Sequence, residues 1–72
     1  MNELYKTIRA YERDGTQHTL DVYSVRIPGA APYFVMLDGA FVATAEHLSG
    51  ATEEVESTVK WFGWSYSNPI FA

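Results

Sequence analysis

The two histidines and their acidic neighbours are the first candidates for metal binding or acid–base catalysis. His18 and Asp21 lie three positions apart in a predicted strand and therefore face opposite sides of it. Glu46 and His47 are adjacent at the end of another predicted strand. Neither spacing assembles the three or four ligands that a zinc ion needs. We therefore expect both histidines to be exposed and unengaged, and we expect no metal site.

Nucleophilic catalysis has no supporting motif in this chain. The sequence has no cysteine, which excludes thiolate nucleophiles, thiolate metal sites and disulfides. Ser24, Ser49 and Ser57 do not lie in a nucleophile-elbow sequence, and no glycine-rich phosphate loop is present. A core this small leaves little room for a pocket of ~300 Å³ or more. We expect no enzymatic activity and no cofactor.

Aromatic and arginine side chains form the third candidate site. Its predicted residues are Tyr5, Arg9, Tyr11, Arg13, Tyr23, Trp61 and Trp64. Rings interleaved with guanidinium groups on an open sheet are typical of proteins that bind single-stranded nucleic acid. A solvent-exposed face of cross-strand aromatic and arginine pairs gives the same pattern. The net charge of −4 and the pI of about 4.9 favour that second interpretation.

The aromatic content itself indicates a surface for a partner. The 2 tryptophans, 5 tyrosines and 4 phenylalanines are more than one helix–sheet core can use. Either an aromatic patch stays exposed and binds a partner, or the C-terminal tail covers the second sheet face within the monomer. Our leading hypothesis is a non-enzymatic protein–protein interaction module that forms a homodimer or docks on another protein. The alternative is single-stranded nucleic-acid binding through the Tyr/Arg face of the first strand. A third hypothesis is a small acidic inhibitor or adaptor that presents Glu53, Glu54 and Glu56 to a basic partner.

Alternating apolar residues and turn signals predict the strands that position these side chains. The predicted strands are residues 4–13, 17–27, 33–37 and 40–46. Asp14-Gly15 and Asp38-Gly39 are hairpin signals. Residues 28–32, rich in proline and glycine, predict a loop.

The alternation also predicts which side chains share a face. Leu4 is an even number of residues from Ile8 and Ala10, so a regular strand places these three side chains on one face. For the same reason Phe41 is expected on one face with Ala43 and Ala45. The nearly continuous apolar run Tyr33–Leu37 predicts a central strand that is covered on both faces.

The pattern within the second strand changes at its centre. In a regular strand the apolar residues Leu20 and Val22 face one side, whereas the apolar residues Tyr23 and Val25 face the other. Either both faces are partly covered there, or a bulge near Tyr23-Ser24 shifts the register. The sequence leaves these alternatives open.

An amphipathic run predicts a helix over residues 51–62. Its expected buried stripe is Ala51, Val55, Val59 and Phe62. Ser49 or Thr52 can cap its start. Gly63 fits the left-handed position after the helix, which places Trp64 against Val59.

Together these elements predict one small α+β domain spanning residues 1–72. Its sheet is a four-stranded antiparallel meander, and one C-terminal helix packs on one sheet face. The short apolar tail 64–72 is expected to run back over the sheet. The N-terminus has no basic region followed by an apolar run, and no apolar stretch approaches the ~20 residues of a membrane span. We therefore predict a cytoplasmic protein with no membrane partner.

Overall fold

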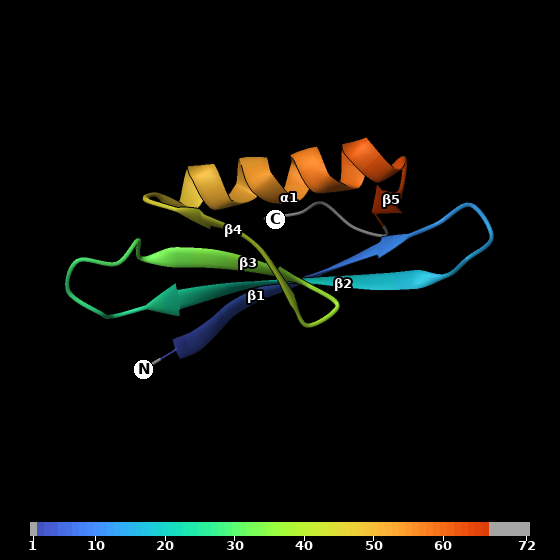
Figure 1. Ribbon diagram of the computed structural model, residues 1–72. Helices are drawn as coiled ribbons and strands as arrows, with labels where there is room; N and C mark the ends of the chain where they lie inside the picture. Colours follow the sequence, from blue (N-terminus) through green and yellow to red (C-terminus); the bar gives the residue numbers. More distant parts are fainter. Residues whose placement is uncertain (1, 67–72) are drawn as a thin grey trace.

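The computed structural model describes residues 2–66 and shows one helix lying across an antiparallel sheet (Figure 1). The elements are β1 Asn2–Tyr11, β2 Gln17–Val25, β3 Tyr33–Leu37, β4 Ala40–Ala45, α1 Leu48–Phe62 and β5 Ser65–Tyr66. The strand order is β4-β3-β2-β1-β5, and every neighbouring pair is antiparallel. The predicted α+β meander with one C-terminal helix is confirmed. The start of the predicted tail forms β5 at the edge of the sheet, and residues 67–72 lie outside the described residues.

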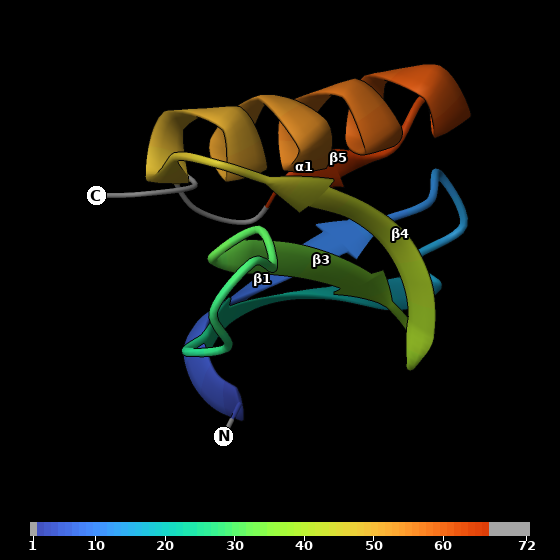
Figure 2. The same cartoon turned by 60° about the vertical axis from the view of Figure 1, so that its left-hand side comes forward.

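The core lies between α1 and the sheet face beneath it. Alternate residues of the strands and residues one helical turn apart on α1 point into it. The buried residues are Ile8, Ala10, Leu20, Val22, Val35, Ala51, Val55 and Val59. No element among the described residues covers the opposite sheet face (Figure 2). The prediction that β3 is covered on both faces is therefore wrong, and Phe34 and Met36 remain partly exposed.

The two aspartate–glycine turns differ in length. Asp38 and Gly39 both have positive φ, at 49° and 86°, as a two-residue type I′ hairpin requires. In the first hairpin Tyr11 pairs with Gln17, so five residues form the loop. The first strand therefore ends two residues earlier than predicted, and Arg13 lies in the loop.

Each outer strand of the meander carries a β-bulge. In β1 the register shifts between Leu4 and Lys6, so Tyr5 is the extra residue. In β4 the pairing steps from Phe41 to Ala43, so Val42 is the extra residue. Of the two alternatives left open for β2, a bulge within β2 is not seen, because the register shift opposite Tyr23 and Val22 comes from the extra residue Tyr5 of β1.

The helix begins at Leu48, three residues earlier than predicted. Its N-cap residue is His47, which makes no side-chain capping hydrogen bond, so neither Ser49 nor Thr52 is the cap. Small residues permit this early start: a Cβ added to Gly50 would lie 3.3 Å from the Cβ of Ala45 on β4.

The predicted helix end is confirmed in detail. Gly63 has a φ of 73°, and its N–H donates to the carbonyl oxygen of Lys60 at 3.1 Å. The N–H of Trp64 donates to the carbonyl oxygen of Val59 at 3.0 Å, which completes a Schellman cap. The predicted burial of Phe62 is wrong, since its side chain is 51% exposed.

Candidate functional site

The uncovered face of the sheet carries a contiguous group of large apolar side chains. Directly paired residues share a face, and Leu4 pairs with Tyr23, which pairs with Phe34. Met36 pairs with Phe41 across β3 and β4, on the same face. We call these five residues, Leu4, Tyr23, Phe34, Met36 and Phe41, the open-face patch.

The geometry of the open-face patch leaves its rim available to solvent. The rings of Tyr23 and Phe34 stack with centroids 5.0 Å apart and planes 10° apart. Leu4 and Phe41, at the two outer strands of the meander, are 56% and 63% exposed. The patch therefore has a packed aromatic centre between two exposed apolar ends.

The other half of the open face is polar. The hydroxyl of Thr7 on β1 donates to Asp21 Oδ1 on β2 at 2.8 Å. Arg9 is exposed opposite Thr19. Tyr11 lies opposite Gln17 at the end of β1. The open face is thus divided into an apolar half and a polar half.

The structure does not bring all seven predicted site residues together. Arg9, Tyr11 and Tyr23 lie on the open face, on two paired strands. Tyr5, at the bulge, instead contacts Tyr33 edge to face, with ring centroids 6.4 Å apart. Arg13 lies in the first loop, outside the strand.

The two tryptophans lie on the helix side of the sheet. Trp61 projects from α1 and is 83% exposed. Trp64 packs against the core cluster. They therefore belong to surfaces other than the open face.

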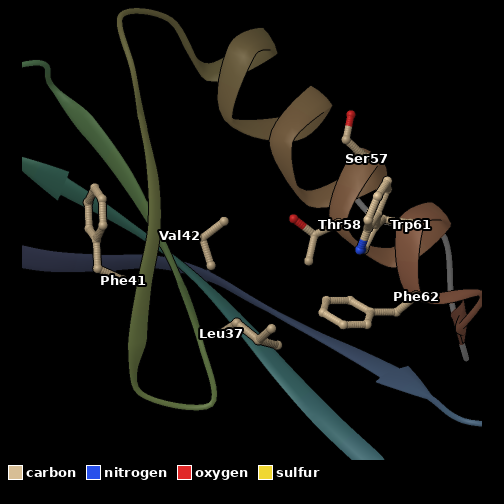
Figure 3. A pocket seen from close by; sticks show the side chains of 7 residues that line it. All are labelled: Leu37, Phe41, Val42, Ser57, Thr58, Trp61 and Phe62. Carbon is tan, nitrogen blue, oxygen red and sulfur yellow. The ribbon is translucent and has the colours of Figure 1, made fainter.

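An apolar groove lies between the C-terminal half of α1 and the β3–β4 hairpin (Figure 3). Its volume is about 440 Å³, and the residues that line it are Leu37, Phe41, Val42, Ser57, Thr58, Trp61 and Phe62. Figure 3 shows the Phe41 ring on the far side of β4, whereas Val42 points toward α1. The groove is a surface hollow that opens beside Trp61, and it does not lie within the core.

His18 lies at the centre of a cluster that sequence reasoning missed. Its Nε2 is 2.6 Å from Glu12 Oε2, and its Nδ1 is 2.7 Å from Asp38 Oδ2. Asp38 is fixed in turn, because its Oδ1 accepts the N–H of Thr19 at 2.8 Å. The prediction of an unengaged His18 is therefore wrong. We call Glu12, His18, Asp38 and Trp64 the histidine cluster.

Three stacked rings connect the histidine cluster to the end of the helix. The imidazole of His18 lies 3.9 Å from the Trp64 ring, with the planes 6° apart. Trp64 also stacks on Phe62 at 4.4 Å. The Schellman cap at Gly63 reverses the chain and so places Trp64 between the two rings. The cluster thereby ties the β1–β2 loop, the β3–β4 turn and the segment after α1 together.

The electrostatics of the cluster favour a protonated imidazole. Both ring nitrogens face carboxylates, and only imidazolium donates from both. Hydrogen bonds to Asp38 and then to Glu12 raise the pKa of His18. The hydrogen bond from His18, and after it the one from the Thr19 N–H, lower the pKa of Asp38.

This arrangement suits a proton-binding structural contact. A general base needs a free nitrogen near a substrate, whereas each His18 nitrogen already faces a carboxylate. The two carboxylates lie at opposite ring nitrogens and do not converge on one point. Within residues 2–66 there is no group of three or more acidic or histidine residues that could hold a metal ion.

The fold and these surfaces define a small α+β domain with a one-sided helix and uncovered apolar area. Comparisons with protein-family models, curated proteins and solved structures found no match. Among the described residues, no helix is long and apolar enough to cross a membrane.

Proposed function

We propose that the protein is a non-enzymatic interaction module that forms a homodimer through the open face of its sheet. The observation that carries this proposal is the open-face patch itself. A sheet with an apolar face is stabilised when a second layer covers that face. Two copies packed face to face, with sheets about 10 Å apart, would supply that layer to each other.

A homodimer would use the whole open face, its polar half as well as the open-face patch. The four strands of the meander contain 10, 9, 5 and 6 residues. At about 3.3 Å per residue and about 4.8 Å between strands, they cover roughly 480 Å² in projection. Side chains standing out from a sheet expose more accessible area than this projection. A dimer at the lower end of specific interfaces needs about 600 Å² per subunit.

The homodimer is tested by measuring mass in solution between micromolar and millimolar protein concentrations. We expect a dimer that Phe41→Lys dissociates, because the substitution puts a charge into an apolar interface. Phe41 is already 63% exposed, so the monomer fold tolerates the change. Trp61→Lys is the matched control: it also replaces an exposed aromatic ring by a lysine, but on α1, and the dimer should persist. Circular dichroism verifies that both variants fold.

A wild-type protein that stays monomeric at millimolar concentration would refute the homodimer. Dissociation by Trp61→Lys and not by Phe41→Lys would move the interface to the helix side.

The hypothesis of single-stranded nucleic-acid binding receives less support from the residue positions. It relied on a continuous face of tyrosines and arginines, and the bulge at Tyr5 and the loop at Arg13 interrupt that face. Asp21 lies on the same face, between Arg9 and Tyr23. The cytoplasmic location remains a prediction from sequence.

A further inference from the structure

A second hollow adjoins the apolar groove along α1. Its volume is about 320 Å³, and Glu53, Glu56, Ser57 and Lys60 line it. Ser57 also lines the apolar groove, so the two hollows share a wall. Two carboxylates beside one ammonium group give the second hollow a negative balance. The outer surface of α1 therefore changes from apolar to acidic across Ser57.

This juxtaposition fits a partner segment that is both apolar and cationic. We propose that the groove binds an extended segment of a partner protein, with one large apolar side chain held beside Trp61. Lysine or arginine side chains of the same segment would lie over Glu56 and Glu53. This surface meets the proposed homodimer interface at Phe41, which lines the groove, although its ring lies on the opposite side of β4 from Val42 (Figure 3).

The helix geometry sets the spacing of the partner's side chains. Glu56 and Glu53 precede Trp61 by five and eight residues, which is about 7.5 and 12 Å along the axis and, at 3.6 residues per turn, about 140° and 80° around it. An extended segment advances about 3.3 Å per residue. A segment that crosses Ser57 to reach these carboxylates therefore carries its cationic residues within about five positions of the apolar anchor.

The charge of the acidic hollow favours this occupant. Glu53 and Glu56 outnumber the one cation there, Lys60, so a cationic segment is attracted. The ammonium group of Lys60 repels a cation at one end of the acidic hollow. The partner's cations are therefore expected nearer Glu53 and Glu56 than Lys60.

Synthetic peptides test the proposal directly on the intact protein by nuclear magnetic resonance. The probe is the capped peptide Lys-Ser-Lys-Ser-Leu, with lysines two and four positions from its apolar anchor. Its matched analogues are Glu-Ser-Glu-Ser-Leu and Lys-Ser-Lys-Ser-Ser. We expect the probe to shift the indole N–H signal of Trp61 and the amide signals of Leu37 and Val42. The probe should bind at least tenfold more tightly than either analogue, and added salt should reduce that difference.

Two double variants separate local from general electrostatics. Glu53→Gln with Glu56→Gln should bring the probe and the acidic peptide within about twofold of each other. Glu3→Gln with Glu46→Gln makes the same change of net charge away from the acidic hollow and should preserve most of the preference.

Several outcomes would overturn this proposal. They are equal binding of the probe and the acidic peptide, no shifts at millimolar probe, or shifts confined to the open-face patch. If the Trp61 indole signal moves with protein concentration alone, and still does so in the Phe41→Lys variant, the occupant is a second copy and the proposal also fails. Failure of the homodimer test would leave these measurements unaffected.

Discussion

Gly63→Ala tests whether the left-handed cap after the helix requires glycine. Gly63 has a φ of 73°, a conformation that costs an alanine about 1–2 kcal/mol. No atom lies within 4 Å of a Cβ placed there, so backbone strain is the main cause of the expected loss of stability. Alanine also restricts the unfolded chain, which offsets about 0.4–1 kcal/mol. The net loss is about 1 kcal/mol, or ~4–8 °C in melting temperature for a domain of this size.

The assay is urea unfolding followed by circular dichroism and tryptophan fluorescence. If the slope of the unfolding free energy against urea concentration is unchanged, the substitution has altered only the stability. Gly63→Asn is the matched control, because asparagine adopts the left-handed region more readily and should lose less stability. The two variants add a side chain at the same open position and differ mainly in backbone preference. An alanine variant as stable as the wild type would refute the reasoning, because the cap would then tolerate any residue.

Three further predictions concern the histidine cluster, the core and the terminal strand. Because the pKa of His18 is raised on folding, its contribution is full below its unfolded pKa of about 6.5 and is lost as pH rises through the folded value. The free energy of unfolding of the wild type should therefore decrease above pH 6.5. His18→Gln should make this decrease smaller, whereas His47→Gln should leave it unchanged. Urea denaturation at pH 5.5, 7 and 8.5 measures the decrease in each variant. Leu20 is fully buried, so Leu20→Ala should lower the unfolding free energy by about 2–5 kcal/mol in urea titrations, and a loss below 1 kcal/mol would contradict its place in the core. The hydroxyl of Tyr66 is buried without a hydrogen-bond partner among the described residues, so Tyr66→Phe should stabilise the protein by up to about 1 kcal/mol; a clear loss in thermal unfolding would show that the hydroxyl is satisfied.

Local chemistry explains which parts of the fold could be predicted from sequence. The type I′ turn depends on two adjacent residues with positive φ and the Schellman cap on one, so Asp38-Gly39 and Gly63 predict them directly. Near the start of α1 the chain instead makes a tertiary contact, since a Cβ at Gly50 would lie 3.3 Å from the Cβ of Ala45, which belongs to a different element. A helix that begins without a side-chain cap leaves no local signal at its first residue.

The histidine cluster shows why a site assembled by tertiary contacts could not be predicted. Glu12 and Asp38 are 6 and 20 residues from His18 in the chain. They meet because two hairpin turns lie at the same end of β2, and the spacing of His18 and Asp21 carries no information about either. The signal that bears on Trp64 is the cap at Gly63, which predicts contact with Val59 and leaves the stacking on His18 unspecified.

The two bulges decide the composition of the open-face patch. Alternation alone places Leu4 with Ile8 and Ala10, beneath α1, because the strand repeat is two residues. The extra residue Tyr5 reverses this parity, so Leu4 pairs with Tyr23 on the open face. A one-residue shift of register moves every side chain beyond it to the opposite face.

The bulge at Val42 has the same consequence on β4. Phe41 shares parity with Ala43 and Ala45, and without the bulge it would point toward α1. The extra residue turns Phe41 to the open face and leaves both Val42 and Ala43 on the helix side. Bulges commonly redirect side chains at sheet edges. Here they expose Leu4 and Phe41 instead of burying them, which is difficult to explain by core packing. An apolar interface on the open face would explain why both bulges turn a large apolar side chain toward that face.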